Sequence, residues 1–75
     1  MTLYDAGEQA VVRLVGVSGG WGARQHLREM GLQVGDAIVI LRRAPFGGPL
    51  ALRSRGAVIA VGRELAKKIR VEPLK

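Results

Sequence analysis

The sequence contains no cysteine, and its aromatic residues are one tryptophan, one tyrosine and one phenylalanine among 75 residues. Without cysteine the chain can form neither a disulfide framework nor a thiolate metal site, and nothing indicates an oxidising compartment. Its longest apolar runs, 37–41 and 57–61, fall far short of the roughly 20 residues that span a bilayer. The N-terminal segment MTLYDAGEQ lacks the regions of a signal peptide. We therefore expect a soluble, cytoplasmic protein.

Catalytic side chains are scarce as well. The chain has one histidine and three serine or threonine residues, from which no Ser/His/Asp arrangement or pair of catalytic carboxylates can be assembled. The glycine-rich segment 16–22 matches neither a dinucleotide fingerprint nor a P-loop, because no Lys-Ser/Thr pair follows it. We interpret this segment as a turn into a helix and expect that the chain is not an enzyme.

His26 and Glu29 are the one pair of side chains whose spacing suits a metal. Residues three apart on a helix lie close enough to share a divalent cation. Two ligands are too few for a site within the fold, so we predict no cofactor and no internal metal, and we interpret the pair as a solvated helix face. An ion held there would need its other ligands from an interface, which makes the pair a weak interface candidate only.

Positive charge is concentrated in one half of the chain. Residues 1–40 contain three basic and four acidic side chains, whereas residues 41–75 contain nine basic and two acidic ones. A basic surface favours an acidic partner, which leaves nucleic acid, an anionic lipid surface and an acidic protein face open.

Hydrophobic periodicity predicts five short strands and two short helices in a single domain, 1–75. The expected strands are 9–17, 36–43, 50–55, 57–61 and 69–72, and the expected helices are 21–30 and 63–68. Because an open sheet of this size would expose its edges, we expect a mainly β chain that closes into a small, strongly bent barrel. The run 37–41 is apolar at every position, so its strand should be buried on both faces or bend through the barrel.

Local signals fix three of the connections. Gly31 falls where a helix ends in a left-handed residue, and Leu32 falls where a Schellman motif packs back on the helix. Residues 33–36 suit a type II turn with Gly35 at the position that needs a positive φ. Residues 55 and 56, Arg-Gly, can form a two-residue hairpin turn.

The segment RRAPFGGPL, residues 42–50, carries the main candidate site. Two prolines and two glycines in 44–49 are typical of a loop, so these residues should connect two strands of a hairpin. Four arginines should cluster around this hairpin, either as a partner-binding surface or as a solvated one. The candidate partner-binding residues are Arg42, Arg43, Pro45, Phe46, Arg53 and Arg55.

Phe46 leaves two structural alternatives. An exposed ring beside Pro45 would be the kind of anchor that contributes most at protein interfaces. The ring could instead fold back and cap one end of the barrel, as expected for a small domain with few aromatics.

The segment LREMGLQVGDAIVILRRAPFGGPLALRSRGAVIAVGRELAKKIRV, residues 27–71, resembles the FeoA family, small cytosolic proteins of bacterial ferrous iron uptake. The order and spacing of its motifs carry the resemblance, which with the N-terminal strand covers nearly the whole chain. Gly48 and Gly62 depart from the family's usual residues. The matching elements are 27–32, Gly35, 41–45, Gly47, 49–50, Gly56, Ala66, Ile69 and Val71.

The resemblance implies a five-stranded SH3-like barrel that acts as an adaptor or regulator of the FeoB permease by binding its cytosolic GTP-binding domain and affecting GTP turnover. Association with the membrane would then occur only through this partner. With one histidine and no cysteine the chain has no cage for ferrous iron, so it should not be an iron carrier. The alternative is a small basic barrel that binds nucleic acid, which the scarcity of stacking aromatics disfavours.

Overall fold

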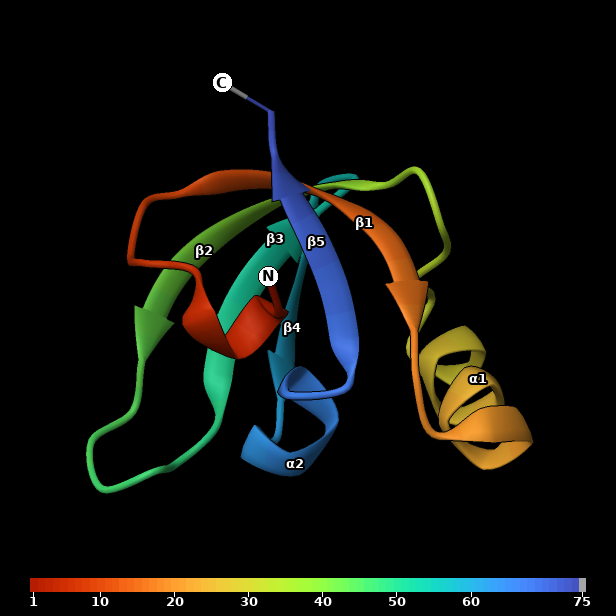
Figure 1. The fold of residues 1–75 in the computed structure, drawn as a ribbon. Coiled ribbons are helices and arrows are strands. Elements are labelled where there is room, and N and C mark those ends of the chain that lie inside the picture. The colour runs from red at the N-terminus through yellow and green to blue at the C-terminus, as the bar shows by residue number, and fades with distance from the viewer. Residues whose placement is uncertain (75) are drawn as a thin grey trace.

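The computed structural model describes residues 1–74, which form five strands, two α-helices and one short 3-10 helix (Figure 1). In chain order these elements are η1 (Leu3–Asp5), β1 (Val11–Val17), α1 (Gly20–Glu29), β2 (Ala37–Arg43), β3 (Leu50–Ser54), β4 (Ala57–Val61), α2 (Arg63–Ala66) and β5 (Ile69–Pro73). The predicted five strands and two short helices are therefore confirmed, with no end displaced by more than two residues, and η1 is an addition.

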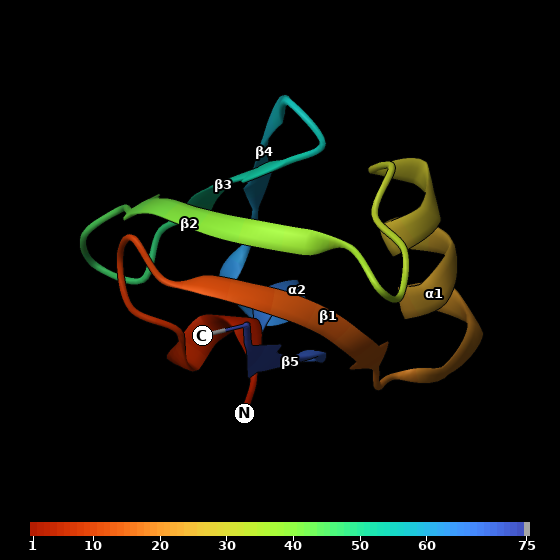
Figure 2. The same ribbon diagram turned by 90° about the horizontal axis from the view of Figure 1, so that it is seen from above.

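All five strands join one antiparallel sheet in the order β4-β3-β2-β1-β5. The sheet curls around the core (Figures 1 and 2), which gives the mainly β, SH3-like architecture that the sequence predicts. The expected closure of the barrel is wrong: in residues 1–74, β4 and β5 are the two ends of the sheet and do not pair with each other. The N-terminal segment covers part of the β5 edge instead, because Val71 N–H donates to Met1 O at 2.9 Å.

Two irregularities give the sheet its curvature. The register of β1 against β5 shifts between Leu14 and Gly16, and that of β2 against β3 shifts between Ile40 and Arg42. Bulges of this kind bend a strand and increase its local twist. The apolar run in β2 therefore bends and is not buried on both faces. Ile38 and Ile40 on one face are buried, while Val39 and Leu41 are half-buried.

The core forms on the concave face of the curled sheet from alternate strand residues, with α1, α2 and η1 contributing one or two apolar side chains each. Complete burial of a Leu or Ile side chain contributes about 1.5–3 kcal/mol, so this small set accounts for much of the stability. The largest fully buried side chains are Leu3, Leu14, Ile38, Ile40, Leu52 and Ile69.

The predicted turns are confirmed. After α1, Gly31 has φ 85°, Gly31 N–H donates to Arg28 O, and Leu32 N–H donates to Leu27 O, which is the Schellman pattern. Gly35 has φ 98°, and Asp36 N–H donates to Gln33 O at 3.1 Å, as a type II turn requires.

The last strand extends one residue further than the sequence predicts. The expected strand ends at residue 72, but Pro73 pairs with Val12 as the final residue of β5. A proline is tolerated there because β5 is an edge strand, where a missing N–H leaves no ladder bond unmade.

Thr2 and Asp5 fasten the N-terminal segment. Asp5 Oδ2 accepts hydrogen bonds from Thr2 N–H at 3.1 Å and from the Thr2 hydroxyl at 3.0 Å. The backbone N–H of Thr2, followed by its hydroxyl, stabilises the charged carboxylate and lowers the pKa of Asp5 below its ordinary value of 3.8.

The longest helix in the described part of the chain is α1 with ten residues, and none of the helices there has the length and apolar composition needed to cross a bilayer.

Candidate partner-binding surface

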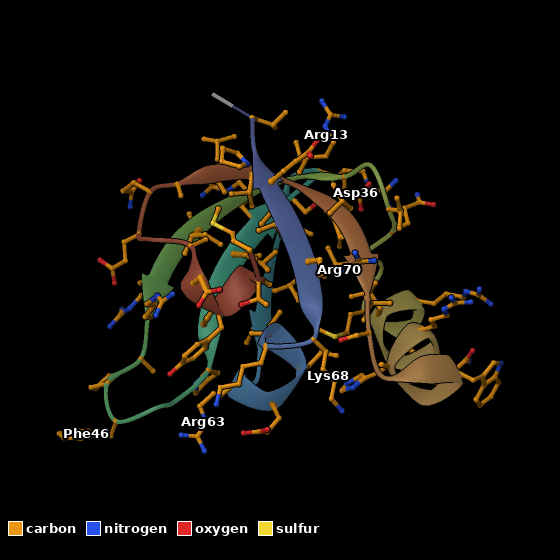
Figure 3. All side chains as sticks on the ribbon, viewed as in Figure 1. Arg13, Asp36, Phe46, Arg63, Lys68 and Arg70 are labelled. Atoms are coloured by element: carbon orange, nitrogen blue, oxygen red, sulfur yellow. The ribbon has the colours of Figure 1, made fainter. Side chains whose placement is uncertain are left out.

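The loop between β2 and β3 presents Phe46 to solvent. The side chain is 103% exposed, and in Figure 3 it lies at the tip of the loop, pointing away from the barrel. The alternative that Phe46 caps the barrel is therefore wrong. Two hydrogen bonds within the loop hold the chain behind it, from Ala44 N–H to Pro49 O at 3.0 Å and from Gly48 N–H to Pro45 O at 3.2 Å.

The backbone at Phe46 is in the left-handed region, with φ 59°, and Gly47 follows with φ 72°. A positive φ is uncommon for a bulky side chain and costs of order 1–3 kcal/mol. Two consecutive left-handed residues turn the chain sharply, which leaves the ring on the outside of the turn. An aromatic side chain held exposed at such a cost is a candidate for binding rather than for stability.

Arg63 of α2 supports the loop from behind. A Cβ on Gly47 would lie 2.6 Å from Arg63 Nη1, so the guanidinium lies directly against the loop backbone. Figure 1 shows the loop and α2 at the same end of the barrel. The positive φ favours glycine at 47, and a side chain there would also displace the Arg63 guanidinium.

Arg42 lies next to this loop, and Arg53 lies on the same convex face of the sheet but nearer the β3–β4 turn. Arg42 pairs with Ala51, Arg53 pairs with Val39, and both arginines are exposed. Because paired residues share a face, the two guanidinium groups project from neighbouring strands on the same side. Val58 pairs with Arg53 from β4, on the side of β3 away from β2, and adds an exposed apolar side chain to this face.

Arg43, by contrast, is engaged within the molecule. Its Nη2 donates to Ala6 O at 2.7 Å, its backbone N–H donates to Glu8 Oε2 at 3.0 Å, and its guanidinium lies over the ring of Tyr4. The side chain is half-buried and joins the end of β2 to the N-terminal segment. Arg43 therefore stabilises the attachment of the N-terminal segment to the end of β2.

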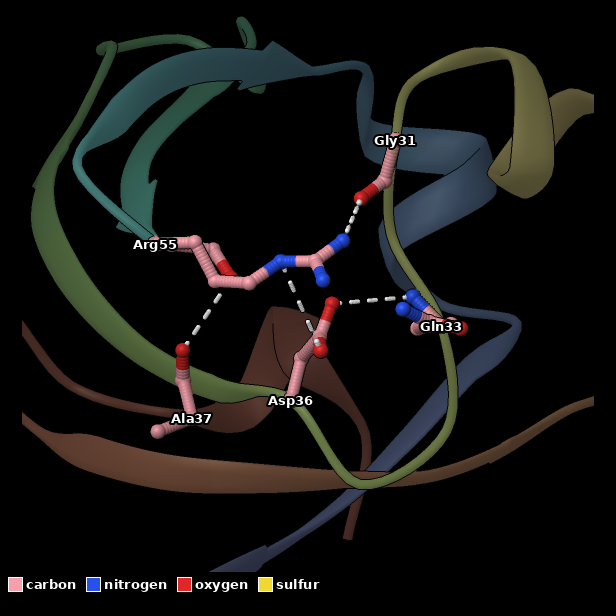
Figure 4. A network of polar contacts seen from close by, with 6 residues as sticks. Gly31, Gln33, Asp36, Ala37 and Arg55 are labelled. Carbon is pink, nitrogen blue, oxygen red and sulfur yellow. Dashed lines mark hydrogen bonds and ion pairs between the residues drawn. The ribbon is translucent and has the colours of Figure 1, made fainter.

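Arg55 lies at the opposite end of the β3–β4 hairpin from Phe46. It forms the turn with Gly56, both at positive φ, and its Nη2 donates to Gly31 O at 3.1 Å. Its Nε lies 3.9 Å from Asp36 Oδ1 (Figure 4). The structure thus keeps Arg42, Pro45 and Phe46 at the loop end of the sheet and places Arg53 and Arg55 toward the β3–β4 turn.

His26 and Glu29 are both exposed on α1. Within residues 1–74, no group of three or more His, Cys, Asp or Glu side chains lies close enough together to hold a metal ion. His26 and Glu29 therefore belong to no larger group of such side chains in that part of the chain.

Trp21, at the start of α1, is an exposed aromatic that the sequence analysis did not single out; its side chain is 77% exposed. Ala23, Leu27 and Met30 form the apolar face of the helix, and Trp21 falls outside that face. This spacing could have identified Trp21 from the sequence as an exposed aromatic. Figure 1 shows α1, which carries Trp21, and the β2–β3 loop, which carries Phe46, on opposite sides of the molecule.

Comparisons with known proteins agree with this architecture. The family model for the FeoA domain matches residues 1–73. A Methanocaldococcus jannaschii protein, provisionally named Fe(2+) transport protein A, is 38% identical over 66 residues, which cover 88% of this chain and 76% of that protein.

Solved structures extend the likeness to the fold. The crystal structure of an iron uptake regulatory protein, FeoA, has 32% sequence identity and a TM-score of 0.87, covering 99% of this chain and 96% of the other. The solution structure of a FeoA-like protein from Clostridium acetobutylicum has 32% identity and a TM-score of 0.90, covering 100% of this chain and 87% of the other.

Proposed function

The chain belongs to the FeoA family, and from this premise we propose that it is a cytosolic adaptor in ferrous iron transport. Its partner is the cytosolic GTP-binding domain of the FeoB permease, and its effect is on GTP turnover there. It reaches the membrane only through this partner. It is a regulator rather than an enzyme or an iron carrier, since its one histidine and lack of cysteine offer iron no set of strong ligands.

The exposure of Phe46 carries the proposal. An aromatic ring with its whole surface in water, on a loop that two internal hydrogen bonds and Arg63 hold in place, is pre-organised for insertion into a pocket. Pre-organisation lowers the entropy that binding costs, so such a side chain can contribute several kcal/mol on its own.

Arg42, next to the loop, and Arg53, further along the same face toward the β3–β4 turn, complete the proposed surface. Exposed arginines steer an acidic partner and accelerate encounter more than they strengthen the final complex. Arg55 is on the far end of the hairpin and Arg43 is occupied internally, so in this account they act on binding indirectly or not at all.

The test is a pull-down of the FeoB cytosolic domain from the same organism, with and without guanine nucleotide. We expect capture by the parent protein, and a nucleotide-dependent yield if the adaptor senses the GTP cycle. Failure of capture under both conditions contradicts the proposal.

The same preparation tests the nucleic-acid alternative. Tight binding to arbitrary single-stranded DNA that falls steeply with salt would favour that function over the adaptor. We expect only weak retention of DNA, because stacking needs several aromatics on one face. The exposed Trp21 and Phe46 come from α1 and from the β2–β3 loop, which lie on opposite sides of the molecule.

A further inference from the structure

A groove of about 690 Å³ lies at the α1 end of the molecule. Its walls are the last residues of β1, one face of α1 and the connection 31–34. Pairing between β1 and β2 covers residues 11–13, so the end of β1 projects past β2 toward α1, as Figure 2 shows. Four arginines line the groove: Arg24 and Arg28 from α1, Arg55 from the β3–β4 turn and Arg70 from β5.

The charges in this groove are unbalanced. Asp36 contacts Arg55, but Arg24, Arg28 and Arg70 make neither a hydrogen bond to another side chain nor a salt bridge within residues 1–74. No aspartate or glutamate lines the groove. Several guanidinium groups facing one space repel each other, so the arrangement is stabilised when an anion enters.

Polar contacts hold one of the four guanidinium groups in place, and a second lies against β1. Arg55 is fixed by Gly31 O at 3.1 Å and by the Asp36 carboxylate, whose other oxygen accepts from Gln33 N–H at 3.0 Å (Figure 4). Arg70 lies flat across β1, and a Cβ on Gly16 would overlap its guanidinium. Figure 3 shows Arg70 extending from β5 toward the α1 side. Glycine at 16 thus allows Arg70 to line the groove.

We propose that this groove binds a linear chain of phosphoryl groups, either free as inorganic polyphosphate or carried by a nucleotide. Arginine is the residue that matches phosphate oxygens bidentately, and all four cations here are arginines. The volume falls within the range of about 300–1,000 Å³ typical of small-molecule sites. Apolar side chains of the wall, Val15, Val17, Leu27 and Val34, leave a surface for the uncharged part of a nucleotide.

A phosphate chain fits better than an acidic peptide because of charge spacing. In an extended peptide, side chains on the same face recur about every 7 Å. Neighbouring phosphoryl groups share one bridging oxygen, so a triphosphate places its charges closer together than an acidic peptide does and can contact several of the arginines that line this one groove. This binding is independent of the adaptor function, because the groove lies beside α1 and Phe46 lies on the opposite side of the molecule.

The experiment is a titration of the full chain with inorganic triphosphate without divalent metal at low salt, followed by calorimetry and by backbone amide NMR. We expect saturable binding near one equivalent, amide shifts concentrated at the end of β1 and in 31–34, and weakening as salt increases. A second titration with a nucleoside triphosphate distinguishes the two sources: tighter binding with additional shifts at Val17 or Val34 indicates a nucleotide, and equal binding indicates free polyphosphate.

Charge-matched variants distinguish a site from diffuse attraction. Arg28→Gln and Arg70→Gln should each raise the Kd for triphosphate about tenfold or more, the effect of losing one charged hydrogen-bond donor. Arg42→Gln and Arg53→Gln remove the same charge from outside the groove and should change the Kd less than about twofold, since they act only through screened solvent. Thermal melting of all four confirms that each variant is folded.

Gly16→Ala tests the placement of Arg70 without removing a charge. The new methyl group should displace the guanidinium and raise the Kd nearly as much as Arg70→Gln, and the double variant should be no weaker than Arg70→Gln alone. The proposal is overturned if millimolar triphosphate leaves the groove amides unmoved, if the outer arginines matter as much as the groove arginines, or if an acidic peptide binds the groove more tightly than triphosphate.

Discussion

The guanidinium of Arg43 lies over the ring of Tyr4, with its Cζ 5.1 Å from the ring centre. The same guanidinium donates to Ala6 O, so Arg43 joins the end of β2 to the N-terminal segment. Arg42, one residue earlier, is exposed and makes no salt bridge or side-chain hydrogen bond in the described chain. Of these two neighbouring arginines, Arg43 therefore contributes contacts that hold the fold together and Arg42 does not.

Arg43→Ala should destabilise the protein, whereas Arg42→Ala should not. Loss of a hydrogen bond from a charged donor together with a cation–π contact is worth about 2 kcal/mol. An exposed, unpaired arginine contributes within about 0.5 kcal/mol. Urea unfolding of the two variants measures the difference, and equal midpoints would show that Arg43 does not brace the N-terminal segment.

Two glycines at the start of α1 should respond to alanine in opposite directions. Gly22 is helical, has no positive φ and has open space around its Cα, so Gly22→Ala should stabilise the protein by about 0.5–1 kcal/mol. Gly20 also has space for a methyl group but has φ 75°, so Gly20→Ala should destabilise it by about 1–2 kcal/mol. Thermal denaturation of both variants provides the check, and a shared sign would contradict the backbone assignment.

Acid should weaken the attachment of the N-terminal segment through Asp5. The pKa of Asp5 is lowered in the folded state by the N–H and hydroxyl of Thr2, so its contribution to stability is fully present well above pH 3.8. That contribution is lost as the pH falls through the lower, folded-state pKa. Asp5→Asn should lose less stability on acidification than the parent, and Glu72→Gln serves as the exposed control. If Asp5→Asn and the parent lost the same stability on acidification, the prediction would be wrong.

Ferrous iron should bind no more tightly than millimolar. The chain offers one imidazole and no thiolate, and first-row metals need more nitrogen or sulfur ligands than that for tight binding. Anaerobic calorimetry with Fe(2+) measures the affinity, with His26→Ala as the control for a surface contact. A stoichiometric micromolar site would mean that the protein carries iron.

Most of the fold could be predicted from the sequence because its signals are local. The end of α1 follows from Gly31 and Leu32, and the β3–β4 turn follows from Arg55 and Gly56, since each signal lies within a few residues of the geometry it specifies. Closure of the barrel could not be predicted in this way. Whether β4 pairs with β5 depends on the curvature from two bulges, which set how far the sheet curls.

The candidate site could be predicted only for residues whose exposure is determined by the residues next to them in the sequence. The prolines and glycines around Phe46 indicated a loop, and the structure then excluded the capping alternative. The four arginines of the hairpin were expected together, yet Arg43 turns inward to Tyr4 and Arg55 lies beside α1. One groove is lined by Arg24, Arg28, Arg55 and Arg70, which lie up to 46 positions apart in the sequence. No pattern in the sequence predicts that they lie together.

Binding of the FeoB cytosolic domain by Phe46→Ala tests the central claim most directly. The ring is fully exposed, so its removal should leave the melting temperature nearly unchanged. Trp21→Ala, which removes the exposed aromatic beside α1, is the matched control. Calorimetry should show that Phe46→Ala weakens binding by at least about thirtyfold, as loss of an interface anchor does, while Trp21→Ala binds like the parent. A folded Phe46→Ala variant that binds the domain as tightly as the parent would contradict the account.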